Sequence, residues 1–147
     1  MQHDTANRLF FRLYQCSNLM HKSGTRVVAH HGATTQQWAV LGALVRPSVR
    51  ARGMTVKALT GYLMLSRQNL TAVLDRLEGR GWVERDKDPD DGRNRLIRMS
   101  DVGEAVWKEM QTPIAAFYRQ ALADLTADDT DTLLRLLDRL RDGLDRA

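Results

Sequence analysis

One polar segment, Ser66 to Gly81 (SRQNLTAVLDRLEGRG), carries side chains that can bond to nucleobases. Gln and Asn suit the edge of adenine, Thr bonds to bases or phosphates, and Arg binds guanine or phosphate. Its apolar residues recur at i, i+3, i+4 and i+7, which predicts a helix that buries Leu70, Val73, Leu74 and Leu77. The other faces then hold the candidate DNA-binding residues Ser66, Arg67, Gln68, Asn69, Thr71 and Arg76. A merely solvated face would more often carry Lys/Glu pairs.

A second polar segment, DPDDGRNRLIRMS (residues 88–100), places acids beside arginines. Pro89 and Gly92 predict a turn, and the flanking runs WVERDK and RLIRM predict the strands of a β-hairpin. We expect Arg93, at the tip, to enter a minor groove, because Arg suits a narrow A·T-rich groove. Arg95 would bind phosphate beside it. Asp91 would bond turn amides or pair with an arginine, and so orient Arg93.

Asp75 is an acid on the predicted DNA-binding face, where phosphates would repel it. It can accept a hydrogen bond from cytosine N4. It can also pair with Arg76 or with an arginine of the hairpin, and this pairing is the favoured alternative. Asp75 is therefore grouped with Asp91 as a residue that supports the hairpin.

These residues need elements to position them, and the pattern along the chain predicts mainly helices. A long first helix runs to a stop at Gly32, and a second helix is capped by Thr34 or Thr35. Pro47 and Gly53 break the pattern before a short helix capped by Thr55. That helix and the Ser66 helix are joined so tightly that they resemble a helix-turn-helix. After the hairpin, Ser100 begins a long helix that Pro113 should kink, and Thr126 caps the last one.

Both terminal helices carry more apolar residues than one core contact requires. The first has a stripe and a second row, and the last has a row of leucines: Leu9, Leu13, Cys16, Met20 and Val27; Phe10 and Tyr14; Leu133, Leu134, Leu136, Leu137, Leu140 and Leu144. Wide apolar surfaces of this kind predict a subunit interface.

The 147 residues suit one domain, or one domain with an added helical part. Charge is uneven: residues 1–45 carry four Lys/Arg and one acid, residues 46–100 twelve and seven, and residues 101–147 six and ten. The basic middle third, at +5, predicts a polyanionic partner. No apolar run reaches the roughly 20 residues of a membrane span, and the N-terminus lacks the pattern of a signal peptide. The single cysteine fits a reducing cytoplasm.

The runs QQWAVLGAL and SRQNLTAVLDRLEGRGWVERDKDPDDGRNRLIRMSDVG resemble the MarR family of bacterial transcriptional regulators, with the family's Asp-x-Arg at Asp91 and Arg93. The family's usual Leu-Thr after the hairpin is Met99-Ser100 here, and Ser can cap the next helix as Thr does. The resemblance implies a winged helix-turn-helix at residues 33–100, enclosed by a helical dimerisation region at 1–32 and 101–147. It implies a homodimer that binds a palindromic operator in double-stranded DNA. It also implies a cytoplasmic protein that is associated with the nucleoid when bound to DNA. We expect a repressor.

The resemblance also implies an effector pocket between the dimer helices and the winged region. The matching stretches hold aromatics with one or two cations: Phe10, Tyr14, Arg26, His30, Trp38, Trp107 and Phe117. Such a set suits an aromatic carboxylate or its CoA thioester. For each aromatic, plain core packing is the competing interpretation.

Other functions remain as alternatives. Cys16 could sense redox state, but a cysteine in an apolar stripe is usually a small core residue. His30 and His31 are adjacent, so they do not share a helix face as a zinc pair would. A helical protein-interaction module would not need the basic middle third. No carboxylate pair, activated nucleophile or phosphate loop indicates an enzyme, and we expect no cofactor or metal.

Overall fold

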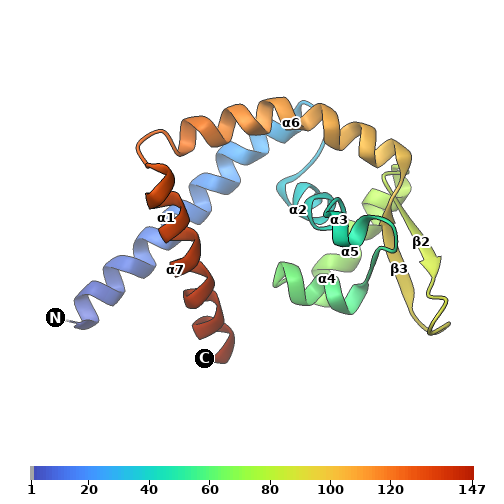
Figure 1. The fold of residues 1–147 in the computed structure, drawn as a ribbon, viewed down its shortest axis with the longest axis horizontal. Coiled ribbons are helices and arrows are strands. Elements are labelled where there is room, and N and C mark those ends of the chain that lie inside the picture. Colours follow the sequence, from blue (N-terminus) through green and yellow to red (C-terminus); the bar gives the residue numbers. More distant parts are fainter. Residues whose placement is uncertain (1) are drawn as a thin grey trace.

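The computed structural model describes residues 2–147, which form a mainly helical molecule with one small antiparallel sheet (Figure 1). In chain order the elements are α1 (Gln2–Ala29), α2 (Thr35–Leu44), α3 (Pro47–Arg50), β1 (Met54–Thr55), α4 (Val56–Leu63), α5 (Arg67–Gly79), β2 (Val83–Lys87), β3 (Arg95–Met99), α6 (Asp101–Ala121) and α7 (Ala127–Arg146). The predicted order of elements, including the β-hairpin, is confirmed.

The winged region consists of α2 to β3, and its core lies between the helices and the sheet. The sheet has the order β1-β3-β2, with Val83 opposite Met99 and Lys87 opposite Arg95. The largest side chains in its core with essentially no exposed surface come from α2, α4, α5 and both hairpin strands: Val40, Leu41, Leu44, Leu59, Leu70, Leu74, Leu77, Val83 and Ile97. This packing holds α5 and the hairpin as one unit.

Hydroxyl side chains begin five of the helices, and the sequence predicts all five. Thr34, Thr55, Ser66, Ser100 and Thr126 each accept a hydrogen bond from the backbone amide three residues on. At Thr34 the pair is reciprocal, because Gln37 also accepts from the Thr34 amide. An N-cap of this kind satisfies an amide that the first helical turn cannot.

Two elements were not predicted from the sequence, and both fall in the stretch that Pro47 and Gly53 were expected to leave irregular. Pro47 begins the one-turn helix α3, where the missing N–H of proline is not needed. Met54 and Thr55 form β1, whose partners on β3 are Ile97 and Leu96. The wing is therefore a three-stranded sheet and not an isolated hairpin.

Figure 1 shows α6 running from the hairpin to α7, with α1 crossing α7 at the far end from the winged region. The helix α6 continues through Pro113 and ends at Ala121, before the predicted end at Leu125. No residue of α7 is buried, and α1 buries only Val28. No helix among residues 2–147 has the length and apolar character needed to cross a membrane.

Candidate nucleic-acid interface

The helix α5 separates an apolar from a polar face as its periodicity predicts. Leu70, Val73, Leu74 and Leu77 are buried against the core. The helix ends at Gly79, and Gly81 follows at φ +74°, a left-handed conformation that glycine adopts without steric cost. The buried residues of α5 therefore fix the orientation of its polar face.

Every predicted DNA-binding residue is exposed: Ser66, Arg67, Gln68, Asn69, Thr71, Arg76, Arg93 and Arg95. The backbone amide of Asn69 donates to Ser66 Oγ at 3.2 Å, so Ser66 acts as the N-cap of α5. The Thr71 hydroxyl donates to the Arg67 carbonyl at 2.8 Å, which leaves its oxygen able to accept from a ligand. Gln68 and Asn69 present amides at the start of the helix. The exposure of this set is confirmed, and its contact with DNA stays a prediction.

At the hairpin tip, the side chain of Arg93 is 92% exposed. Asp91 Oδ1 accepts from the Arg93 backbone amide at 3.1 Å and from its Nε at 3.3 Å. Asp91 Oδ2 also accepts from Asn94 Nδ2 at 3.3 Å. The acid closes the turn and directs the arginine, as the sequence predicts.

Asp75 pairs with an arginine of the wing, which is one of the two pairings expected for it. Arg85, on β2, donates from Nη2 to Asp75 Oδ1 at 2.7 Å, and its Nε pairs with Glu78 one turn further along α5. Arg85 is the residue that sequence reasoning missed. It joins α5 to the wing, because one planar guanidinium can serve two carboxylates.

A second unpredicted contact anchors the wing to the loop before β1. Arg52 Nη2 lies 2.7 Å from Asp90 Oδ2 and 3.4 Å from Asp88 Oδ1. Asp88 is buried, and its Oδ1 also accepts from the Asp90 amide at 2.9 Å. The hydrogen bond and charge of Asp90, with the charge of Asp88, raise the pKa of Arg52. Two of the three acids before the tip therefore hold the wing, and the third orients Arg93.

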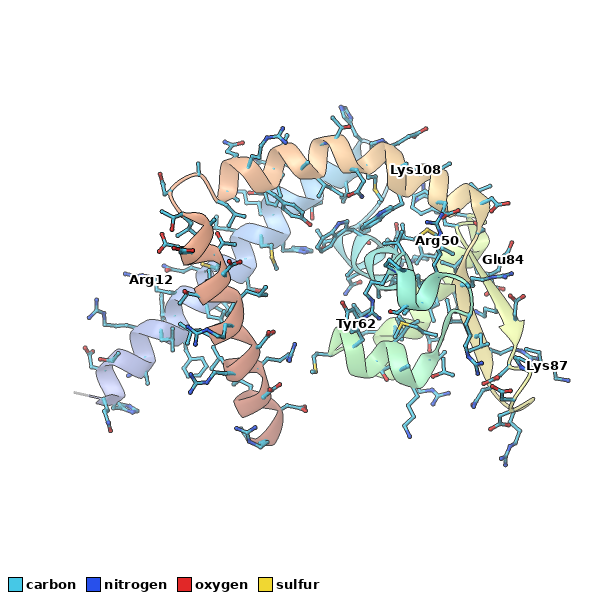
Figure 2. All side chains as sticks on the ribbon, in the orientation of Figure 1. Arg12, Arg50, Tyr62, Glu84, Lys87 and Lys108 are labelled. Carbon is cyan, nitrogen blue, oxygen red and sulfur yellow. The ribbon has the colours of Figure 1, made fainter. Side chains whose placement is uncertain are left out.

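The outer face of the wing carries its own ion pairs. Arg98 lies 2.8 Å from Asp86 and 3.1 Å from Glu84, and Arg50 pairs with Glu104 on α6. Figure 2 shows Arg50 and Glu84 near the start of the hairpin and Lys87 towards its tip. A groove of about 710 Å³ lies between α3, β3 and the start of α6, and its walls include Arg50, Glu84, Arg98 and Glu104.

The residues predicted for an effector pocket do not form one site within a single chain. Arg26 lies 16 residues beyond Phe10 on the continuous helix α1, about 24 Å along its axis. Phe10, Tyr14, Arg26 and His30 are exposed, whereas Trp38 and Trp107 are half-buried against the core. A Cβ on Gly42 would stand 3.2 Å from Trp107 Cη2, so this ring packs on α2. Phe117 contacts the Tyr118 ring at a centroid distance of 6.1 Å.

A second groove, of about 950 Å³, has none of those residues in its lining. It lies between α7 and the turn that joins α4 to α5, with walls that include Leu137, Leu144, Met64 and Ser66. Cys16, expected as a small buried residue, is exposed on α1. No group of three His, Cys, Asp or Glu side chains in residues 2–147 is placed to hold a metal ion.

A helix-turn-helix (α4–α5) with a polar second helix, followed by an arginine-tipped hairpin, defines a winged-helix protein. A model of the MarR family matches residues 49–94, which include β1, α4, α5, β2 and the turn that follows β2. The chain belongs to the MarR family of transcriptional regulators.

Two curated relatives and one solved structure extend this match. The transcriptional activatory protein BadR of Rhodopseudomonas palustris is 49% identical over 97% of this chain and 82% of its own length. The homoprotocatechuate degradative operon repressor of Escherichia coli is 33% identical over 76% of this chain and 73% of its own. A cysteine-to-serine mutant of MarR from E. coli, solved with operator DNA, superposes with a TM-score of 0.80 at 25% identity, over 90% of this chain and 93% of that one.

Proposed function

We propose that this regulator binds a palindromic operator as a homodimer. The exposed row of Gln68, Asn69 and Thr71 beside the projecting Arg93 carries the proposal. The amides and hydroxyl would read base edges in the major groove, and Arg93 would enter the adjacent minor groove. Arg67, Arg76 and Arg95 would bind phosphates. The similarity to a protein solved with operator DNA supports this assignment.

In this proposal, residues 1–32 and 101–147 form the dimerisation region, and residues 33–100 bind DNA. The exposed leucines of α7 and apolar residues of α1 support the first assignment. One recognition helix reads too few base pairs for useful specificity, so two subunits would bind half-sites about 34–36 Å apart. The partner is a second copy of this chain.

The sign of regulation depends on where the operator lies relative to the promoter. The sequence prediction is a repressor. One relative is named as an activatory protein and the other as a repressor. A promoter–reporter fusion assayed with and without the regulator gives the sign: lower reporter output with the protein supports repression, and higher output overturns it.

We further propose a small aromatic acid, or its CoA thioester, as effector. Arg26 lies in the last turn of α1 and His30 directly follows the helix, and both could bind a carboxylate. The half-buried Trp38 and Trp107 could pack on a ring. Phe10 and Tyr14 lie too far along α1 to join this group within one chain. One relative is named as the repressor of an operon that degrades homoprotocatechuate, an aromatic acid.

DNA titrations test the operator proposal. Fluorescence anisotropy with promoter fragments from the DNA that flanks the regulator's own gene should show salt-sensitive binding to a palindrome. Inserting five base pairs between the half-sites turns one to the opposite side of the helix, and should reduce affinity to the level of a half-site. Binding that is unaffected by this insertion would contradict the dimer on two half-sites.

An effector screen follows from the same assay. Aromatic carboxylates and their CoA thioesters should raise the melting temperature and change the affinity for the promoter fragment. Arg26→Gln should remove both responses, and Arg12→Gln, further towards the N-terminus of α1, is the matched control. A screen with no response from either ligand class would count against this effector.

A further inference from the structure

One arginine after the recognition helix α5 reaches a part of the chain almost fifty residues away. Arg80 forms the C-cap of α5, and its backbone amide donates to the Arg76 carbonyl at 3.1 Å. Its side chain turns to the connection between α1 and α2. Nη1 donates to the Gly32 carbonyl at 2.6 Å, and Nη2 donates to the His31 carbonyl at 3.3 Å. One guanidinium therefore bonds two successive carbonyls of this connection.

The same side chain also contacts α2 and the base of the wing. Nη1 lies 3.5 Å from Oε1 of Gln37, a buried residue that completes the cap of α2. The guanidinium carbon lies 3.6 Å from the centroid of the Trp82 ring, a cation–π contact. Trp82 precedes β2, and its carbonyl accepts from the Ser100 amide at 3.0 Å. Arg80 thus joins α5, the wing, α2 and the end of α1.

Gly32 fits this contact in two ways. It adopts φ +69°, where a residue with a Cβ is strained. A Cβ at this position would also stand 3.0 Å from Arg80 Nη2, closer than most Cβ contacts. His31 of the same connection also lies near α6, with its Nε2 4.0 Å from Glu109 Oε2.

We propose that Arg80 is a positioning residue that couples the α1–α2 connection to the recognition helix and the wing. A shift of the connection would move two carbonyl acceptors of Arg80, and with them the C-terminal end of α5. Arg80 lies nine to twelve residues beyond the proposed base-reading residues Gln68, Asn69 and Thr71, about 14–18 Å along the helix. Its guanidinium is engaged by the carbonyls of the α1–α2 connection and by the Trp82 ring, so it would act on DNA binding through geometry and not through a phosphate contact. The proposal rests on the DNA-binding function proposed above.

Replacing the guanidinium tests this role. Arg80→Gln should weaken promoter binding about tenfold, because the planar fork and its stacking on Trp82 are lost. The salt slope should stay at the wild-type value, since no counterion-releasing contact is removed. Arg80→Lys, which retains the charge and can reach one carbonyl, should restore part of the affinity. Lys108→Gln removes a charge from an exposed position of α6 (Figure 2) and should change neither quantity.

Either of two binding results would overturn the proposal. A salt slope that falls by about 0.9 in Arg80→Gln would make Arg80 a phosphate contact. An unchanged affinity, with the variant fully folded at the assay temperature, would make its contacts merely structural.

Hydrogen exchange tests the coupling itself and does not need DNA. Arg80→Gln should speed amide exchange about threefold in both residues 31–33 and residues 80–82, because one side chain joins these segments. Faster exchange in only one segment would overturn the coupling. If the wild-type protein fails to bind the promoter, the proposed function is wrong and the exchange result alone decides the role of Arg80.

Hydrogen exchange measured in the presence of operator DNA is a further test of the coupling. Operator binding should slow exchange at residues 31–33 in the wild-type protein, and should not do so in Arg80→Gln. Equal slowing in both proteins would contradict transmission through Arg80.

Discussion

The winged region buries most of its large apolar side chains within one chain, whereas the terminal helices leave most of theirs exposed. In the winged region, Leu59, Leu70 and Ile97 have no exposed surface. In α7, by contrast, Leu134 is 61% exposed and Leu144 49%. Burial of apolar surface is the main stabilising contribution to a fold. The winged region therefore has a complete core in one chain, whereas the terminal helices have the surface expected of a subunit interface.

Within residues 2–147, the arginines of the winged region fall into two groups, those paired with acids and those without a carboxylate partner. This division explains the acids beside the arginines in the DPDDGRNRLIRMS segment. Within the winged region, acids pair with the arginines that hold the framework, Arg52, Arg85 and Arg98. Among the described residues, Arg67, Arg76 and Arg95 form no ion pair with a carboxylate, so they stay available for phosphate. The acids of the described chain thus set the framework and leave Arg67, Arg76 and Arg95 unpaired, whereas Arg93 at the tip pairs with Asp91, the acid that orients it.

The strongest test of this comparison removes the apolar face of α7. Leu133→Asp with Leu137→Asp should convert a dimer into monomers, because two charges cannot be buried there without partners. Promoter affinity should fall about a thousandfold, since each monomer would bind one half-site. Analytical ultracentrifugation and anisotropy measure the two effects. Arg135→Asp, on the opposite face of α7, is the control and should remain dimeric. A dimer in the double variant would contradict the proposed interface.

A core truncation in the winged region should have the next largest effect. Leu74→Ala removes a side chain with no exposed surface and should lower the free energy of unfolding by about 3 kcal/mol. Urea titration at a fixed protein concentration measures this loss. Leu134→Ala, on α7, should cost well under half as much at a protein concentration low enough to keep the chain monomeric. Equal costs at the two positions would show that the exposed face of α7 is as well buried as the core.

At the tip of the wing, Arg93→Ala should weaken promoter binding about tenfold and reduce the salt slope by about 0.9. The expected loss follows from the exposed guanidinium that projects beyond the ion pairs of the framework. The unfolding free energy should hardly change, which separates this variant from Leu74→Ala. An unchanged affinity would remove Arg93 from the interface.

The smallest expected effect belongs to the acid that orients Arg93. Asp91→Ala should weaken promoter binding about threefold, although it removes a negative charge near phosphates. The reason is the loss of three hydrogen bonds that shape the tip, from the amide and Nε of Arg93 and from Asn94. Asp131→Ala, in the first half of α7, controls for charge. Tighter binding by Asp91→Ala would show that repulsion outweighs orientation.

Much of the fold follows from local patterns in the sequence. The stripe of α5, the five hydroxyl caps and the turn between β2 and β3 each depend on residues within one or two helical turns of each other. The predicted DNA-facing set came from the same periodicity, and its exposure is confirmed. The missed β1 has only two residues and pairs across about forty positions, so no local pattern indicates it.

In the candidate site, too, local features were predicted from the sequence and long-range partners were not. Sequence reasoning expected Asp75 to pair with an arginine, but Arg85 was indicated only by its place on the predicted strand. The effector residues were grouped by resemblance, and the length of α1 separates Phe10 from Arg26.

The sequence by itself determined the six longer helices, the hydroxyl residues that begin five of them, which face of α5 is polar and which family the chain belongs to. Those properties depend on neighbours in the chain, so periodicity and capping residues are enough. Only the tertiary structure decided that Arg52 holds Asp88 and Asp90, and that Arg80 bonds the carbonyls of His31 and Gly32. These partners are 36 to 49 residues apart, and a single sequence carries no signal for which distant charges and carbonyls the packed core brings within hydrogen-bond reach.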